Sequence, residues 1–246
     1  MKLYKLLSFS FLIATLTSCT FTENIYINDN GTGKFAVDMD GSPIMEMAGD
    51  QIAGQMGENK KDIDTTFTFK EVFAEKKDSI AKLSPETQKE LKKLENYVVS
   101  TKISSEKKVF LMNMATDFKN VNELQDILQT LGTLQKLEGG KNPMGSGFGD
   151  NGSKLSYTYD GKKFTRKAVV DQQKAVKPQD AEGDMSKMMF ASSSYIVKYH
   201  FPKKIKKVSN PTAVFSDDRK SITIQYTFTD YMENPDKLNF DVEFEK

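Results

Sequence analysis

The sequence of 246 residues has few of the side chains on which most site chemistry depends: no tryptophan, one cysteine and one histidine. The single cysteine, Cys19, excludes an internal disulfide and any thiolate cluster around a metal. Nucleophilic catalysis needs a base beside the nucleophile. The only imidazole, His200, shares a strand face with Ile196 and Lys198 in "SYIVKYHF", so it is expected at the surface. We therefore predict that the protein is not an enzyme and holds no metal or dissociable cofactor.

An excess of charge of one sign is also lacking. The chain has 35 basic and 34 acidic side chains, and without Lys2 and Lys5 the count is 33 against 34. A nucleic-acid binder usually shows a basic excess, so we expect no nucleic-acid partner. The apolar run from Leu6 to Leu16 is shorter than the roughly 20 residues that a membrane-spanning helix needs.

The first eighteen residues have the layout of a secretory signal: a basic start, an apolar run and small residues. The stretch Leu16-Thr17-Ser18-Cys19 resembles the lipobox of bacterial lipoproteins, which combines an aliphatic residue, two small residues and a cysteine. The resemblance implies cleavage between Ser18 and Cys19, a diacylglyceryl thioether on Cys19 and an acyl chain on its amino group. The alternative is an ordinary secreted protein with a cysteine near its cleavage site.

The residues after Cys19 indicate at which membrane the protein is located and how far its domain can extend from that membrane. In lipoproteins, aspartate after the cysteine favours the inner membrane, whereas here Thr20 follows and no acidic run of the cell-surface type is present. We expect a lipid-anchored protein on the periplasmic face of the outer membrane. A strand predicted from Glu23 leaves residues 19–22 as a tether of roughly 10–14 Å, so the domain is expected against the membrane.

Alternating polarity and turn residues predict an α+β fold, an antiparallel sheet built from β-hairpins with three to four packed helices. Hairpins are expected at 23–40, 97–114 and 153–170. Further strands are expected at 64–71, 194–201, 212–216, 221–228 and 239–245, and helices at 42–56, 84–94, 120–137 and 180–189.

The expected organisation is a signal at 1–18, an anchor and tether at 19–22, an α+β half at 23–138, a glycine-rich loop at 139–152 and a β-rich half at 153–246. The alternative is that the two halves form one continuous domain.

Two polar motifs have competing interpretations. The stretch "YHFPKKIKK" carries four lysines that would contact anionic headgroups or protect an edge strand: Lys203, Lys204, Lys206 and Lys207. "DMDGS" spaces Asp38, Asp40 and Ser42 like calcium ligands, but Pro43 and Gly49 occupy the glycine and glutamate positions of that loop. We interpret it as a strand end followed by a helix cap.

Methionine occurs in close groups: Met45 and Met47, Met112 and Met114, and Met185, Met188 and Met189. The interpretation from the residues is adaptable core packing. Cu(I) ligation by thioethers and a lining for an apolar ligand are the alternatives.

The segment from Tyr199 to Phe228 resembles the closing segment of LppM-like lipoproteins, through Phe201-Pro202, Asn210, Asp217-Asp218 and an alternating last strand. The tryptophan of that family is absent here. This resemblance implies an anchored α+β domain involved in lipid handling. The whole chain also resembles uncharacterised lipoproteins of Bacteroidetes.

Together these features predict a non-enzymatic interaction or structural module of the cell envelope, with the membrane and an envelope protein as partners. The alternative is a carrier or sensor of a lipid or other apolar ligand. A carrier requires an apolar cavity of at least about 300 Å³.

Overall fold

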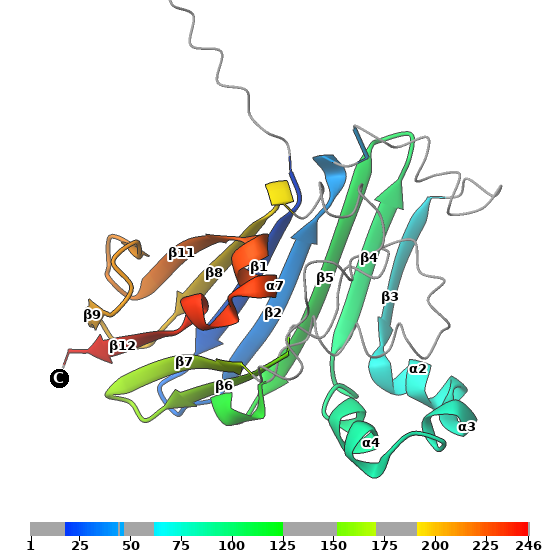
Figure 1. Cartoon of the computed structure of the whole chain (residues 1–246), viewed down its shortest axis with the longest axis horizontal. Helices are drawn as coiled ribbons and strands as arrows, with labels where there is room; N and C mark the ends of the chain where they lie inside the picture. The colour runs from blue at the N-terminus through cyan, green and yellow to red at the C-terminus, as the bar shows by residue number, and fades with distance from the viewer. Residues whose placement is uncertain (1–17, 44, 47–61, 125–151, 171–190, 246) are drawn as a thin grey trace, which may run out of the picture.

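The structure, a computed structural model, describes residues 18–43, 45–46, 62–124, 152–170 and 191–245. Within these ranges the chain is mostly β: an eight-stranded sheet A packs against a four-stranded sheet B (Figure 1). The predicted α+β class with three to four packed helices is therefore wrong. The helices that are described have four to eight residues and lie at strand ends.

Sheet A is built from strands that lie all along the described chain, from Thr20 to Thr227. Its strands, in spatial order, are β10 (Val214–Phe215), β11 (Ser221–Thr227), β8 (Ser194–His200), β1 (Thr20–Ile27), β2 (Gly33–Asp40), β5 (Val109–Phe118), β4 (Val98–Ser104) and β3 (Ile63–Thr68). Strands from both sides of the glycine-rich segment thus share one sheet.

One strand pair departs from the predicted antiparallel hairpins. β1 and β8 pair in parallel, with Thr20 opposite Ser194 and Tyr26 opposite His200. Parallel neighbours need a long crossover between them. Turn and alternation patterns identify only strands that are adjacent in sequence, so they could not reveal this pair.

The three predicted hairpins are confirmed as β1–β2, β4–β5, and β6 with β7 in sheet B. The Asn-Gly and Asp-Gly turns hold Gly31 and Gly161 at φ of 81° and 80°, the left-handed region that glycine adopts without a steric cost. β1 begins at Thr20, three residues earlier than predicted.

Sheet B contains β6 (Ser153–Tyr159), β7 (Lys163–Val170), β12 (Phe240–Phe244) and β9 (Ile205–Val208), in that order. The helices are α2 (Phe69–Glu75), α3 (Lys77–Ile80), α4 (Pro85–Lys92) and α7 (Phe228–Glu233), with 3₁₀ helices at Val121–Glu123 and Pro235–Leu238. No described helix is long and apolar enough to cross a membrane.

Three α-helices were predicted as strand or not at all: α2, α3 and α7. α2 replaces the end of the strand expected at 64–71 because a capping box starts a helix there. The Thr68 hydroxyl accepts from the Glu71 N–H at 3.3 Å, and the Glu71 carboxylate accepts from the Thr68 N–H at 2.6 Å. α7 begins at a similar cap, where the Thr227 hydroxyl accepts from the Asp230 N–H at 3.0 Å.

The helix expected at 84–94 is confirmed in part as α4. The helices expected at 42–56, 120–137 and 180–189 lie mostly outside the described residues, as do the signal and the glycine-rich loop.

The core lies between the two sheets and is rich in aromatic rings. Phe164 of β7 packs against Tyr199 and Phe201 with ring centroids 5.3 and 5.4 Å apart, and Tyr195 stacks on Tyr231 of α7 at 4.5 Å. Sheet B and α7 lie over one face of sheet A on the side of β8, β1 and β2 (Figure 1). We call the opposite face of sheet A the outer face.

Candidate functional site

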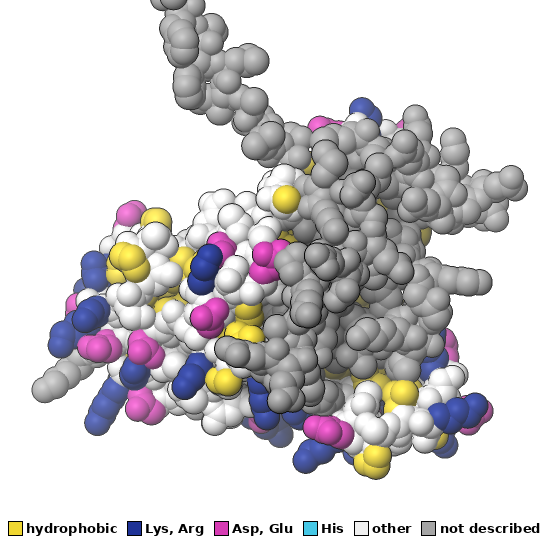
Figure 2. Space-filling view, in the orientation of Figure 1, with side chains coloured by type: hydrophobic (Ala, Val, Ile, Leu, Met, Phe, Trp, Pro, Cys, Tyr) yellow, Lys and Arg dark blue, Asp and Glu magenta, His cyan; other side chains and the backbone are white. Residues whose placement is uncertain are grey.

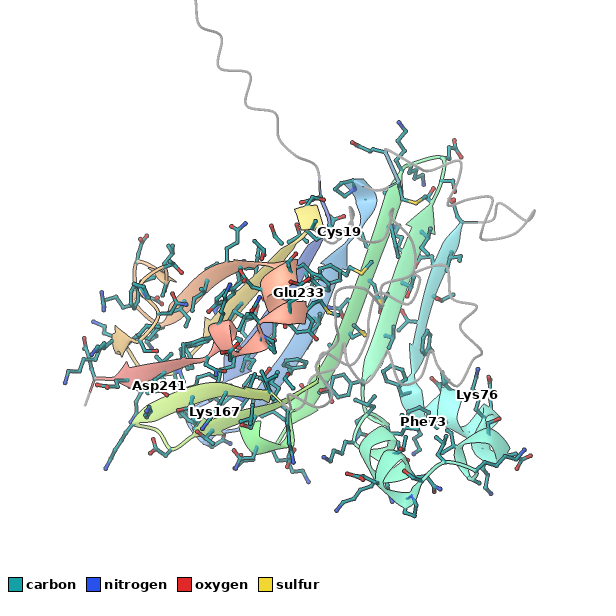
Figure 3. All side chains as sticks on the ribbon, viewed as in Figure 1. Cys19, Phe73, Lys76, Lys167, Glu233 and Asp241 are labelled. Carbon is teal, nitrogen blue, oxygen red and sulfur yellow. The ribbon has the colours of Figure 1, made fainter. Side chains whose placement is uncertain are left out.

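Cys19 is the residue directly before β1, at the end of sheet A where that central strand begins (Figure 3). Its carbonyl accepts from the Ser194 N–H at 3.0 Å, and its side chain is 1% exposed. Burial raises the pKa of the Cys19 thiol to about 12. Of residues 19–22, predicted as the anchor and tether, residues 20–22 belong to β1, so no linker separates Cys19 from the fold.

This position constrains any lipid on Cys19. A diacylglyceryl group has no room where the side chain is buried, so an acylated Cys19 must turn its side chain out of the core. The carbonyl that joins the sheet can stay in place during that rotation. Exposing one small side chain costs on the order of 1–2 kcal/mol.

A buried charged cluster lies four residues along β1. The Glu23 carboxylate, 2% exposed, faces sheet B, where Arg166 of β7 is also 2% exposed. Arg166 Nη2 and Glu23 Oε2 are 3.3 Å apart, and Arg166 Nη1 donates to the Leu238 carbonyl at 3.2 Å. Three tyrosine hydroxyls complete the cluster by donating to Glu23: those of Tyr157, Tyr195 and Tyr199.

The cluster keeps its charges although it is buried. Burial opposes ionisation of Glu23, but the Arg166 guanidinium and the hydroxyls of Tyr195 and Tyr199 outweigh it and hold the pKa of the carboxyl below its usual value. Burial and the Glu23 charge raise the pKa of Tyr199 well above the ordinary phenol value. Tyr199 therefore stays a neutral donor, and Glu23 stays an acceptor.

Both carboxylate oxygens of Glu23 are occupied by donors from within the protein, and solvent does not reach them. A catalytic or ligand-binding carboxylate would need a free lone pair and an approach path. The arrangement can instead join the two sheets and fix their register.

The outer face of sheet A carries a hollow of about 660 Å³ at the end of the sheet that holds Cys19. Its lining includes Thr20 and Thr22 of β1, Asp38 and Asp40 of β2, and Asn113 of β5. Thr22, Asp38 and Asn113 are direct neighbours across β1, β2 and β5. The hollow is open to solvent. Most of its lining residues are polar, but apolar atoms make up the larger part of its surface.

Hydrogen bonds fix the central carboxylate of this hollow. Asp38 accepts from the Asn113 side-chain amide at 2.6 Å and from the Asn24 side-chain amide at 2.8 Å. Asp40 accepts from the Ser42 N–H at 2.9 Å. No lysine or arginine among the described residues forms an ion pair with either aspartate.

The four predicted headgroup lysines lie elsewhere. Lys203 and Lys204 follow the end of β8 that is farther from Cys19, about 20 Å along the strand from Ser194. The Lys203 ammonium donates to the Gly161 carbonyl at 2.9 Å. Lys206 and Lys207 are exposed on β9, an edge strand of sheet B. Figure 2 shows acidic and basic side chains intermingled over this end of the molecule, which fits the edge-strand interpretation.

The side chains weighed for metal or catalytic chemistry have other contacts. His200 is half-buried, stacks on Tyr26 at 4.2 Å and has Nδ1 2.8 Å from the Ser221 hydroxyl. Among the described residues, no group of three or more histidine, cysteine or acidic side chains is placed to hold a metal ion. Met45 and Met114 are core residues, whereas Met47, Met185, Met188 and Met189 lie outside the described ranges.

The sequence reasoning missed the Glu23 cluster, although a signal was present. Glu23 occupies the same phase of β1 as Phe21 and Ile25, and Arg166 the same phase of β7 as Phe164. Opposite charges in the apolar phase of two strands indicate a buried pair. The hollow had no comparable signal, because polar residues in the other phase indicate only a solvated face.

Comparisons with known proteins give one similar structure. No protein-family description matches the chain, and no curated protein sequence matches it. The NMR structure of the folded domain of LppM from Mycobacterium tuberculosis aligns with TM-score 0.39 and 9% identity, over 92% of this chain and 89% of that chain. This likeness does not assign the chain to a family.

Proposed function

We propose that this protein is a lipid-anchored, non-enzymatic interaction module of the cell envelope, held on the periplasmic face of the outer membrane. The observation that carries the proposal is the position of Cys19 directly before β1. With the lipid on that residue, the end of sheet A that holds the hollow would lie against the membrane surface.

The energetics of the anchor support this arrangement. Turning Cys19 out of the core costs on the order of 1–2 kcal/mol. An acyl chain contributes about 0.8 kcal/mol per buried methylene, so a dozen methylenes contribute about 10 kcal/mol. The free energy gained by burying the acyl chain in the membrane therefore exceeds the cost of exposing Cys19 several-fold.

Two features favour a binding module over a carrier of apolar ligands. The space between sheets A and B is filled by packed rings such as Phe164 and Phe240, 6.4 Å apart, and is crossed by the Glu23–Arg166 pair. The hollow that the described residues line is instead open to solvent and presents polar side chains from β1, β2 and β5. We therefore assign binding to the outer face and place the partner at the membrane surface.

Membrane fractionation tests the proposal. The Cys19→Ser variant should leave the membrane fraction, whereas Thr20→Ala, a matched control at the next residue, should stay there. Retention of Cys19→Ser at the wild-type level would contradict the anchor and with it the proposed function.

A further inference from the structure

We propose that the hollow on the outer face binds a saccharide chain that carries no acidic groups. The inference deepens the proposed function, and rests on it, by naming the ligand class of the same face. It starts from the hollow itself, whose volume of about 660 Å³ lies within the usual range for ligand sites.

The lining matches the surface of a sugar. Hydroxyl, amide and carboxylate groups from four adjacent strands form one row: Thr22, Asp38, Asn113 and Ser100. With neighbouring strands about 4.8 Å apart, this row is about 15 Å long. Leu111, 41% exposed, adds an aliphatic patch on which the C–H face of a pyranose can pack.

The central acceptor is held in place before any ligand arrives. Asn24 and Asn113 each donate one amide N–H to Asp38, at 2.8 and 2.6 Å. An ionised carboxylate has about four lone-pair sites, so acceptor sites remain for sugar hydroxyls. Hydrogen bonds to a charged acceptor are about twice as strong as neutral ones. A side chain already fixed by its neighbours also loses little conformational entropy on binding.

Charge complementarity selects among saccharides. Asp38 and Asp40 have no ion-pair partner among the described residues. The lining also contains a lysine, Lys102, but its Nζ lies 3.7 Å from Asp64 Oδ2 and so pairs with that carboxylate. An acidic sugar would meet uncompensated negative charge, whereas a hydroxyl or amino group would be attracted. The ligand is therefore a neutral or amine-bearing saccharide.

Calorimetric titration of the protein purified from membranes in detergent tests the inference, with chitotriose and trigalacturonate as probes. Chitotriose should bind at least tenfold tighter than trigalacturonate. Asp40→Asn, which keeps the acceptor for the Ser42 N–H, should weaken chitotriose binding about tenfold. Asp38→Asn should weaken it by at least as much, and Asp217→Asn, an exposed acid outside the lining, should leave it unchanged.

Three results would overturn the inference: no binding of chitotriose by the wild type, equal binding of the two probes, or wild-type affinity in both aspartate variants. A thermal melt of each variant separates lost binding from lost folding. The titration does not depend on lipid at Cys19, because the protein can also be purified from whichever fraction contains it. Failure of sugar binding and failure of anchoring are therefore separate results.

Discussion

Glu23 and Arg166 join the two sheets through a buried ion pair, with Nη2 and Oε2 3.3 Å apart and both side chains 2% exposed. Glu23 lies four residues after Cys19, on strand β1, which begins directly after that cysteine. The strand that would receive the membrane anchor is therefore the one that is tied to sheet B through the core.

Replacing Glu23 by glutamine should destabilise the fold strongly. The substitution leaves the Arg166 charge buried without its partner, and breaking a buried pair in this way costs about 3–5 kcal/mol. Urea unfolding followed by circular dichroism at pH 7 measures the difference. A loss below about 1 kcal/mol would contradict the cluster.

The difference in stability between the wild type and Glu23→Gln should depend on pH. The pKa of Glu23 is lower in the fold than its ordinary value of 4.5. The carboxylate therefore contributes stability that is present above pH 4.5 and is lost as the pH falls through the folded pKa. The stability gap between wild type and Glu23→Gln should narrow on acidification below pH 4.5. As a control, adding Arg166→Met to Glu23→Gln should recover part of the loss, because no unpaired charge remains.

The Cys19 thiol of unlipidated protein should react slowly with Ellman's reagent at pH 8. Its pKa is raised to about 12 by burial, and the thiolate is the reactive form. Reaction in urea, where the chain is unfolded, should be at least tenfold faster. Equal rates in folded and unfolded protein would show that Cys19 is not held in the core.

Gly33→Ala should destabilise the β1–β2 hairpin by about 1–3 kcal/mol. A Cβ at Gly33 would lie 1.9 Å from the Tyr26 carbonyl oxygen and 2.5 Å from the Phe118 ring. Thermal unfolding measures the effect, with Lys34→Ala at the next, exposed position as the control. Similar melting temperatures for the two variants would argue against this register.

Neutralising the four lysines of the β8–β9 region should not release the protein from membranes. Lys203, Lys204, Lys206 and Lys207 are on the far side of β8 from Cys19 or on edge strand β9. The quadruple Lys→Gln variant should stay in the membrane fraction after a high-salt wash, as the wild type does. Its release would support these lysines as headgroup contacts.

Local sequence signals predicted strands well and the global arrangement poorly. Alternation and Asn-Gly or Asp-Gly turns identified β1–β2, β4–β5 and β6–β7, because a hairpin is specified within about twenty residues. The parallel β1–β8 pair joins residues 174 positions apart, Thr20 and Ser194, and no local pattern encodes it. The α+β class was wrong because short capped helices such as α2 end strands without forming a layer.

The candidate site likewise has features that the sequence predicts and features that it does not. Cys19 was predicted as the lipidation site from its motif, whereas its burial depends on the strands beside it. The pair of Glu23 and Arg166 could have been predicted, because each residue lies on the apolar face of its strand. The three tyrosines that donate to Glu23 come from strands that meet only in the fold. The hollow depends on the curvature and register of sheet A, which the sequence pattern does not specify.

Mass spectrometry of the N-terminal peptide from membrane-extracted protein tests the central claim, the lipid anchor, most directly. We expect a peptide that begins at Cys19 and carries the mass of a diacylglyceryl group and an acyl chain. A peptide that begins elsewhere, or an unmodified Cys19 in protein recovered from membranes, would contradict it.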